Sequence, residues 1–178
     1  MKFFLIGFLL IFNNLWSQNI YWSENQKLVW DNFKSKTNNL GGSTVVAYTH
    51  CGWEYSATTS SDPKIPVKIT IQTVFNENKS WKDVKRINDY VLLHEQKHFD
   101  IAEIHARKLR KEVSEKIKTT ADYNKLFKII YAKISSEYKG FQTDYDRITE
   151  HGMNKEKQAE YNILIAEELN NLKNFQKI

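Results

Sequence analysis

The sequence predicts an α+β domain in which a small antiparallel sheet of about three strands is followed by two or three long helices. Apolar and polar residues alternate in the first half of the chain, whereas from Ser80 onward apolar residues recur every three or four positions. Strands grouped ahead of helices are typical of an α+β fold. Since the sequence also has no glycine-rich phosphate loop, a doubly wound nucleotide-binding domain is not expected.

The first 18 residues have the pattern of a secretory signal peptide. Lys2 precedes an apolar run over residues 3–12, and a polar stretch ends at Ser17. The apolar run is too short to span a bilayer as a helix, so we expect cleavage near residue 18 rather than a retained anchor. The mature chain would be a single domain, residues 19–178, secreted or periplasmic and without a stable membrane span.

Two segments are predicted to form strands. Residues 43–60 are expected to form two strands broken near Gly52, and residues 65–75 alternate strictly between apolar and polar side chains. The face of the second segment expected to meet the core holds Ile65, Val67, Ile69, Ile71, Thr73 and Phe75.

A first long helix is expected over residues 81 to about 118. Ser80 and Asp83 resemble a capping box, and no proline or glycine follows until Gly140. A joint in this helix is expected near Asn88.

A second helix is predicted to begin near Thr120 and to end at Gly152, and a third is predicted to begin after Asn154. Residues with helical spacing mark the packed face of the second helix: Phe127, Ile130, Ile134, Tyr138, Phe141, Tyr145 and Ile148.

Charge and cysteine content restrict the partners. The formal net charge of +5 comes mostly from lysines spread along the helices without interleaved aromatics, so we expect no nucleic-acid partner. The single cysteine, Cys51, cannot form an internal disulfide. We therefore expect the exported domain to be stabilised by its core, to which a bound metal ion can add.

His94, Glu95 and His98 form an HExxH motif in the first predicted helix. Two helical residues four positions apart lie about 40° apart around the axis and about 6 Å apart along it, so both imidazoles can bind one metal ion. Glu95 lies on the adjoining flank, where in zinc peptidases a carboxylate takes the proton of metal-activated water.

A lysine- and glutamate-rich helix can contain this motif by chance. The histidines, however, fall on the same stripe as Ile87, Val91 and Ile101, which should face the interior. Buried imidazoles need partners, and a shared metal ion provides one for both.

A hydrolytic zinc site needs a third protein ligand. His105 lies on nearly the same face, but it is seven residues beyond His98, about 10 Å along the axis, so we expect it to pack or to support a ligand. The segment "YDRITEHG" is the better source. His151 is the favoured third ligand, Asp146 is the alternative, and Glu103 is the third choice.

Other polar residues are weaker candidates for the site. Tyr145 is expected to pack or to polarise a substrate carbonyl, and Asp100 or Asp146 to orient a ligand imidazole through its second nitrogen. His50 and Cys51 would point to opposite faces of a strand, so at most one of them can join a shared site.

Four segments resemble a bacterial family of predicted secreted zinc-dependent proteases known as domain of unknown function 922 (DUF922). They are "LVWDNFKSK", "SWKDV", "LLHEQKHFDIAEIHARKLR" and "YDRITEHGMNKEKQAEYN", and the resemblance extends over most of the mature chain. It implies a zincin-like domain with His94 and His98 as metal ligands, Glu95 as catalytic base, and residues 145–152 as part of the site.

The favoured function is a zinc metallopeptidase that hydrolyses a peptide or protein substrate with Glu95 as general base. The alternative is a non-catalytic, zinc-stabilised binding domain in which a fourth protein ligand closes the site. A third alternative is a helical interaction module without a metal ion.

Overall fold

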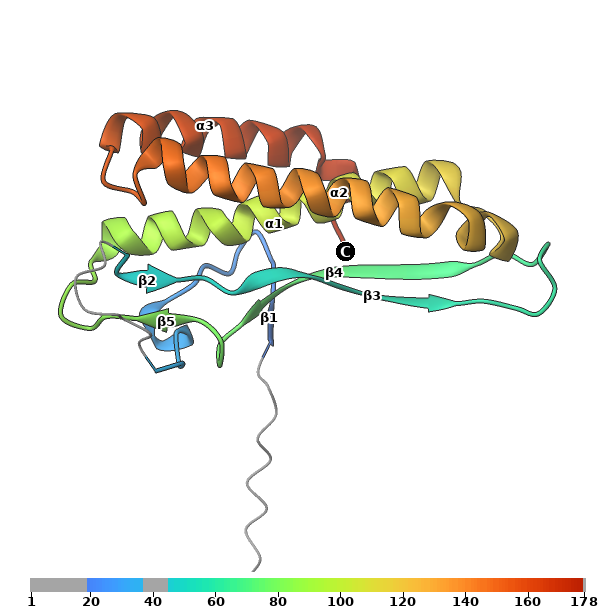
Figure 1. Cartoon of the computed structure of the whole chain (residues 1–178), viewed down its shortest axis with the longest axis horizontal. Helices are drawn as coiled ribbons and strands as arrows, with labels where there is room; N and C mark the ends of the chain where they lie inside the picture. The colour runs from blue at the N-terminus through green and yellow to red at the C-terminus, as the bar shows by residue number, and fades with distance from the viewer. Residues whose placement is uncertain (1–18, 37–44, 178) are drawn as a thin grey trace, which may run out of the picture.

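The computed structural model describes residues 19–36 and 45–177, and its architecture is the predicted α+β arrangement (Figure 1). The strands form one layer, and three long helices cover one side of it (Figure 1). The predicted signal segment, residues 1–18, lies outside the described residues. Within the described part of the chain, no helix combines the length and the apolar character needed to cross a membrane.

The strands form two small antiparallel sheets. The first has the order β1 (Asn19–Tyr21), β4 (Lys68–Asn76) and β3 (Cys51–Thr58). The second pairs β2 (Ala47–Tyr48) with β5 (Trp81–Lys82).

The two predicted strands form, but the break between them lies before Gly52, which pairs with Val74 inside β3. The interruption between β2 and β3 falls instead at Thr49 and His50. It lies opposite the segment that joins β4 to β5, where Asn76 N donates to His50 O. The partner strand, and not the glycine, therefore sets the position of the break.

The alternating segment does place its apolar side chains inside. Ile71 and Phe75 are buried, and Ile69 packs against the same core. Ile65 is an exception, since it precedes β4 and is exposed.

The first helix, α1 (Asp89–Lys116), begins later than predicted. The proposed capping box is wrong: Ser80 Oγ accepts from His50 N and donates to Asn76 O, and residues 81–82 form β5. The true N-cap is Asn88, whose side chain accepts from Val91 N. Residues 81–88 have a local preference for helix, but pairing with β2 overrides it. This pairing depends on residues distant in the sequence, so a local pattern does not predict it.

The other two helices begin where the sequence predicts. α2 (Thr120–Thr149) is capped by Thr119 in a reciprocal capping box with Asp122, and α3 (Lys155–Asn171) is capped by Asn154. α2 is a single helix that runs through Gly140.

α1 lies between the sheet and the other two helices (Figure 1). It contributes buried side chains to all three apolar clusters of the core: Leu109 to the first, Phe99 to the second and Ile104 to the third. Each large apolar side chain buried in this way stabilises the fold by about 1.5–3 kcal/mol. The helix that carries the HExxH motif is thus the central element of the domain, and several of its polar side chains, including His94, Glu95 and Glu103, are buried.

Candidate metal centre

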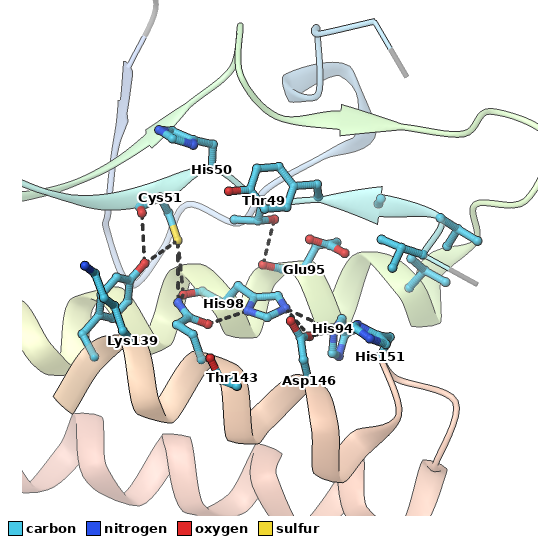
Figure 2. Close-up of a pocket in the computed structure, with 17 residues that line it drawn as sticks. Thr49, His50, Cys51, His94, Glu95, His98, Lys139, Thr143, Asp146 and His151 are labelled. Atoms are coloured by element: carbon cyan, nitrogen blue, oxygen red, sulfur yellow. Dashed lines mark hydrogen bonds and ion pairs between the residues drawn. The ribbon is translucent and has the colours of Figure 1, made fainter. Parts of the chain in front are cut away.

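Three ligand atoms converge between α1 and α2 (Figure 2). His94 Nε2 lies 3.2 Å from His98 Nε2, and Asp146 Oδ1 lies 3.1 Å from the first and 3.0 Å from the second. Within residues 19–36 and 45–177, these three side chains form the group of histidine, cysteine and acidic residues that is close enough to share one metal ion.

The spacing of these atoms fits a zinc ion. With metal–ligand bonds of about 2.0–2.1 Å, neighbouring ligand atoms of a tetrahedral zinc site lie about 3.3 Å apart. The three measured distances, 3.0–3.2 Å, are slightly shorter than that edge. Two imidazoles and one carboxylate are also a common set of three protein ligands in catalytic zinc sites.

The outer nitrogens of both imidazoles face amide oxygens. His98 Nδ1 faces Gln142 Oε1, and His94 Nδ1 lies 2.9 Å from Gln158 Oε1. Because Gln142 Nε2 donates to His98 O at 2.9 Å, the oxygen of that amide must face the ring. The Nδ1 atoms therefore carry the protons, and in neutral rings the Nε2 atoms present lone pairs.

The centre consequently brings two lone pairs and a carboxylate oxygen together, an arrangement that requires a positive charge between them. A proton is one such charge. Burial lowers the pKa of His98, but the hydrogen bond to Asp146 and the charges of Glu95 and Asp146 outweigh it and raise that pKa to about 9. Burial raises the pKa of Asp146, but its hydrogen bonds to His94 and His98 bring that pKa well below its ordinary value.

Glu95 lies beside these ligands and is almost completely buried, yet its Oε2 has no hydrogen-bond partner among the described residues. A buried carboxylate oxygen without a partner costs about 1–3 kcal/mol or more. Glu95 lines a pocket of about 580 Å³ together with His94, His98 and Asp146. A carboxylate that lacks a partner next to a metal site is placed to accept a proton.

His151, the favoured third ligand in the sequence analysis, lies at the edge of the cluster. Its Nδ1 is 3.5 Å from Asp146 Oδ1, its side chain is 43% exposed, and it is not part of the three-atom group. Asp146, the alternative, occupies the central position. The reason is that α2 continues to Thr149, which keeps Asp146 on the helical face that meets α1.

Beyond Thr149 the chain turns through three residues with positive φ, Glu150, His151 and Gly152. A Cβ at Gly152, whose φ is +82°, would lie 3.1–3.2 Å from atoms of the His94 side chain. Glycine is required there for both its conformation and its size. The turn that carries His151 therefore packs directly against a metal ligand.

Tyr145 lies behind the ligands and does not line the pocket. It is fully buried and stacks on His94, with ring centroids 4.6 Å apart and an interplanar angle of 16°. Burial raises the pKa of Tyr145, so its hydroxyl keeps its proton. The geometry assigns it a supporting role and gives it no access to a substrate carbonyl.

The remaining acidic candidates serve other contacts. Asp100 accepts from Trp22 Nε1, Gln96 Nε2 and Lys97 Nζ, so it orients neither ligand histidine. Glu103 is paired with two arginines of α1 and lies outside the metal-ligand group.

His105 packs as the helix geometry predicts. Its Nδ1 lies 2.8 Å from Ile101 O, and its ring meets Tyr138 and Phe141 edge to face. Burial lowers the pKa of His105, which keeps the ring neutral in this setting.

The two strand candidates also stay out of the cluster. His50 points away from the His94–His98 pair (Figure 2). Cys51 Sγ donates to His98 O at 3.4 Å, and burial raises the pKa of this thiol to about 12, so it stays protonated.

Sequence reasoning missed the two glutamines that orient the ligands, because it sought carboxylates for that role. Gln142 lies one helical turn before Asp146, so the spacing on α2 could have identified it. Gln158 is carried by a different helix, and no local pattern marks it.

Comparison with known proteins gives a family but no characterised relative. No curated protein and no solved structure matches the chain. The family described as "Bacterial protein of unknown function (DUF922)" matches residues 26–152, a segment that contains Glu95 and all three ligand residues. The chain therefore belongs to the DUF922 family.

Proposed function

We propose that this chain is a secreted or periplasmic zinc-dependent metallopeptidase, with His94, His98 and Asp146 as zinc ligands and Glu95 as general base. The observation that supports this function is the convergence of three ligand atoms beside a buried carboxylate oxygen for which the described part of the chain offers no hydrogen-bond partner. The two imidazoles suit zinc better than they suit calcium or magnesium, which prefer oxygen ligands.

The ligands and the base have different roles in the reaction. When bound, zinc supplies the Lewis acidity that allows water to lose a proton near neutral pH. Glu95 accepts that proton through the oxygen that has no other partner and then passes it to the leaving amine of the substrate. Gln142 and Gln158 keep the ligand lone pairs directed at the site.

The strand beside the pocket favours a peptide substrate. Residues 45–51 line the pocket opposite α1. Val46 O accepts from Asp83 N, and His50 N donates to Ser80 Oγ, so the even-numbered residues direct their backbone groups toward the β5 side. The backbone groups of Ala47 and Thr49 consequently point to the opposite edge, where both residues line the pocket.

An extended peptide can pair with such an edge through main-chain hydrogen bonds. The edge is also held near the base, because Thr49 Oγ1 donates to Glu95 O at 3.3 Å. A scissile peptide bond bound along this strand would therefore lie close to Glu95.

The test compares Glu95→Gln with the wild-type mature chain, using a library of fluorescence-quenched peptides. Glu95→Gln should bind one zinc per chain and lose at least about 10²-fold in cleavage rate, because general-base catalysis contributes about 10²–10⁴-fold. Cleavage that survives this substitution in metal-verified protein would contradict the mechanism.

The second candidate function is a zinc-stabilised binding domain, and the position of His151 favours it. Its Nδ1 lies only 3.5 Å from Asp146 Oδ1, so a small movement would make it a fourth protein ligand. X-ray absorption at the zinc edge separates the two functions: three imidazoles indicate a closed site, whereas two imidazoles and a bound water indicate a catalytic one.

A further inference from the structure

We infer that α3 is part of the metal centre: Gln158 is a positioning residue that sets the tautomer of His94, and Asn162 sets the orientation of Gln158. The inference depends on the metal site of the proposed function and is independent of peptide-bond hydrolysis. It extends the centre beyond residue 152, where the match to the family ends.

Gln158 is completely buried and uses both ends of its amide. Its Oε1 lies 2.9 Å from His94 Nδ1 and 3.0 Å from the Tyr145 hydroxyl. Its Nε2 donates to the Tyr145 hydroxyl at 2.7 Å and to Asn162 Oδ1 at 2.9 Å. The Tyr145 hydroxyl thus contacts both ends of the amide, whereas Asn162 Oδ1 contacts the nitrogen and leaves the oxygen facing the ligand ring.

The direction of this amide decides whether His94 can bind a metal ion. In the reverse orientation, Nε2 of Gln158 would donate to His94 Nδ1, and the neutral ring would carry its proton on the inner nitrogen. That nitrogen, Nε2, faces Asp146 Oδ1 and His98 Nε2, and once protonated it has no lone pair for a metal ion. Asn162 opposes the reversal because its Oδ1 accepts from the amide nitrogen of Gln158.

The two ligand histidines are thus held in the same way by different helices. Gln142 of α2 orients His98 and is itself fixed by the backbone oxygen of His98. Gln158 of α3 orients His94, and the direction of its amide is fixed by the Asn162 side chain. The support of His94 is therefore the one that substitutions on α3 can break.

Gln158→Leu should weaken zinc binding about 10- to 100-fold, the usual effect of losing the outer partner of a metal-bound histidine. Gln158→Glu keeps an acceptor for His94 Nδ1 and should restore affinity to near the wild-type value. Asn162→Leu should cause a smaller loss than Gln158→Leu, since it frees the amide to turn without removing it. Affinity is measured on the mature chain by competition with a chromogenic zinc chelator.

Gln176→Leu is the matched control. Gln176 also uses its amide oxygen in a partly buried hydrogen bond, to Arg107 Nη2 at 3.0 Å, but it is not part of the metal centre. Its substitution should leave zinc affinity unchanged. A second readout is the Nδ1–H proton resonance of His94 in zinc-loaded protein, which should persist in Gln158→Glu and be lost to solvent exchange in Gln158→Leu.

Two outcomes would overturn this inference alone: wild-type affinity in Gln158→Leu, or equal losses in the Leu and Glu variants, which would assign Gln158 a packing role. If Gln158→Leu does not fold, the zinc affinities of Gln158→Glu and Asn162→Leu, compared with that of the wild type, test the inference instead. A wild-type chain that binds no zinc would contradict both the proposed function and this inference.

Discussion

α1 carries two buried polar clusters that differ in whether their charges are satisfied. In the first, Glu103 is paired with Arg107 at 2.8 Å and Arg110 at 3.0 Å, and it also accepts from Thr73. In the second, the metal centre, lone pairs and carboxylates face one another, and Glu95 Oε2 has no hydrogen-bond partner within residues 19–36 and 45–177. Buried polar groups that serve the fold alone are normally satisfied, so a buried carboxylate oxygen without a partner among the described residues points to a site that can bind a ligand.

The arginines of the satisfied cluster also form hydrogen bonds with the C-terminal segment. Arg107 Nη1 donates to Leu169 O, and Arg110 Nη1 donates to Phe175 O. This cluster therefore joins α1 to the end of α3, and it does so with complementary charges. The metal centre differs in both respects: the Asp146 side chain is 33% exposed, and its carboxylate faces two histidines, where a proton or a metal ion can supply the positive charge.

The largest expected effect is a loss of stability when the hydrogen-bonded Glu103 cluster is broken. Glu103→Gln should lower the free energy of unfolding by about 3–5 kcal/mol, because it leaves Arg107, which is 2% exposed, buried without its counter-ion. Urea unfolding of the mature chain measures the change, and zinc stoichiometry should not alter.

Glu112→Gln is the control for that substitution, since its pairs with Lys116 and Lys133 are more exposed and should contribute less than about 1 kcal/mol. Equal effects of the two substitutions would show that the buried network does not stabilise the fold.

The second effect concerns the metal centre. Zinc at a hundred times its Kd should stabilise the wild-type chain by about 2.7 kcal/mol. Asp146→Ala should lose both the bound zinc and this stabilisation, whereas His151→Ala should keep them, because only Asp146 belongs to the three-atom group.

Metal analysis and thermal unfolding with and without zinc make this comparison. Complete loss of zinc in His151→Ala, with zinc retained in Asp146→Ala, would instead identify His151 as the third ligand.

The smallest expected effect is a stabilisation of the fold, whereas the substitutions above destabilise it. In metal-free protein, Glu95→Gln should raise the free energy of unfolding by about 1 kcal/mol, because a neutral amide costs less to bury than an unpaired carboxylate. Chemical unfolding in the presence of a chelator measures it.

Glu77→Gln is the matched control, since Glu77 is equally buried but paired with Lys34 and bonded to Asn32. That substitution should destabilise the chain. A destabilised Glu95→Gln variant would mean that Glu95 has a stabilising role in the fold.

Local sequence was sufficient for much of the fold. The start of α2 near Thr120, the Asn154 cap of α3 and the alternation in β4 depend on residues close in sequence, and the structure agrees with these predictions. The predicted helix start at residue 81 was wrong because β5 forms only through pairing with β2, about thirty-five residues earlier. The break at Gly52 was misplaced for the same reason, since the partner strand sets it.

By itself the sequence determined the HExxH helix, since the four-residue spacing puts His94 and His98 on one face of any α-helix. It also excluded His105 by distance along that helix. Only the tertiary structure placed Asp146, and not His151, beside His94 and His98, because this arrangement depends on how far α2 continues before the chain turns. It alone revealed Gln158, because hydrogen-bond partners from different helices meet through packing and leave no periodic signal in the chain.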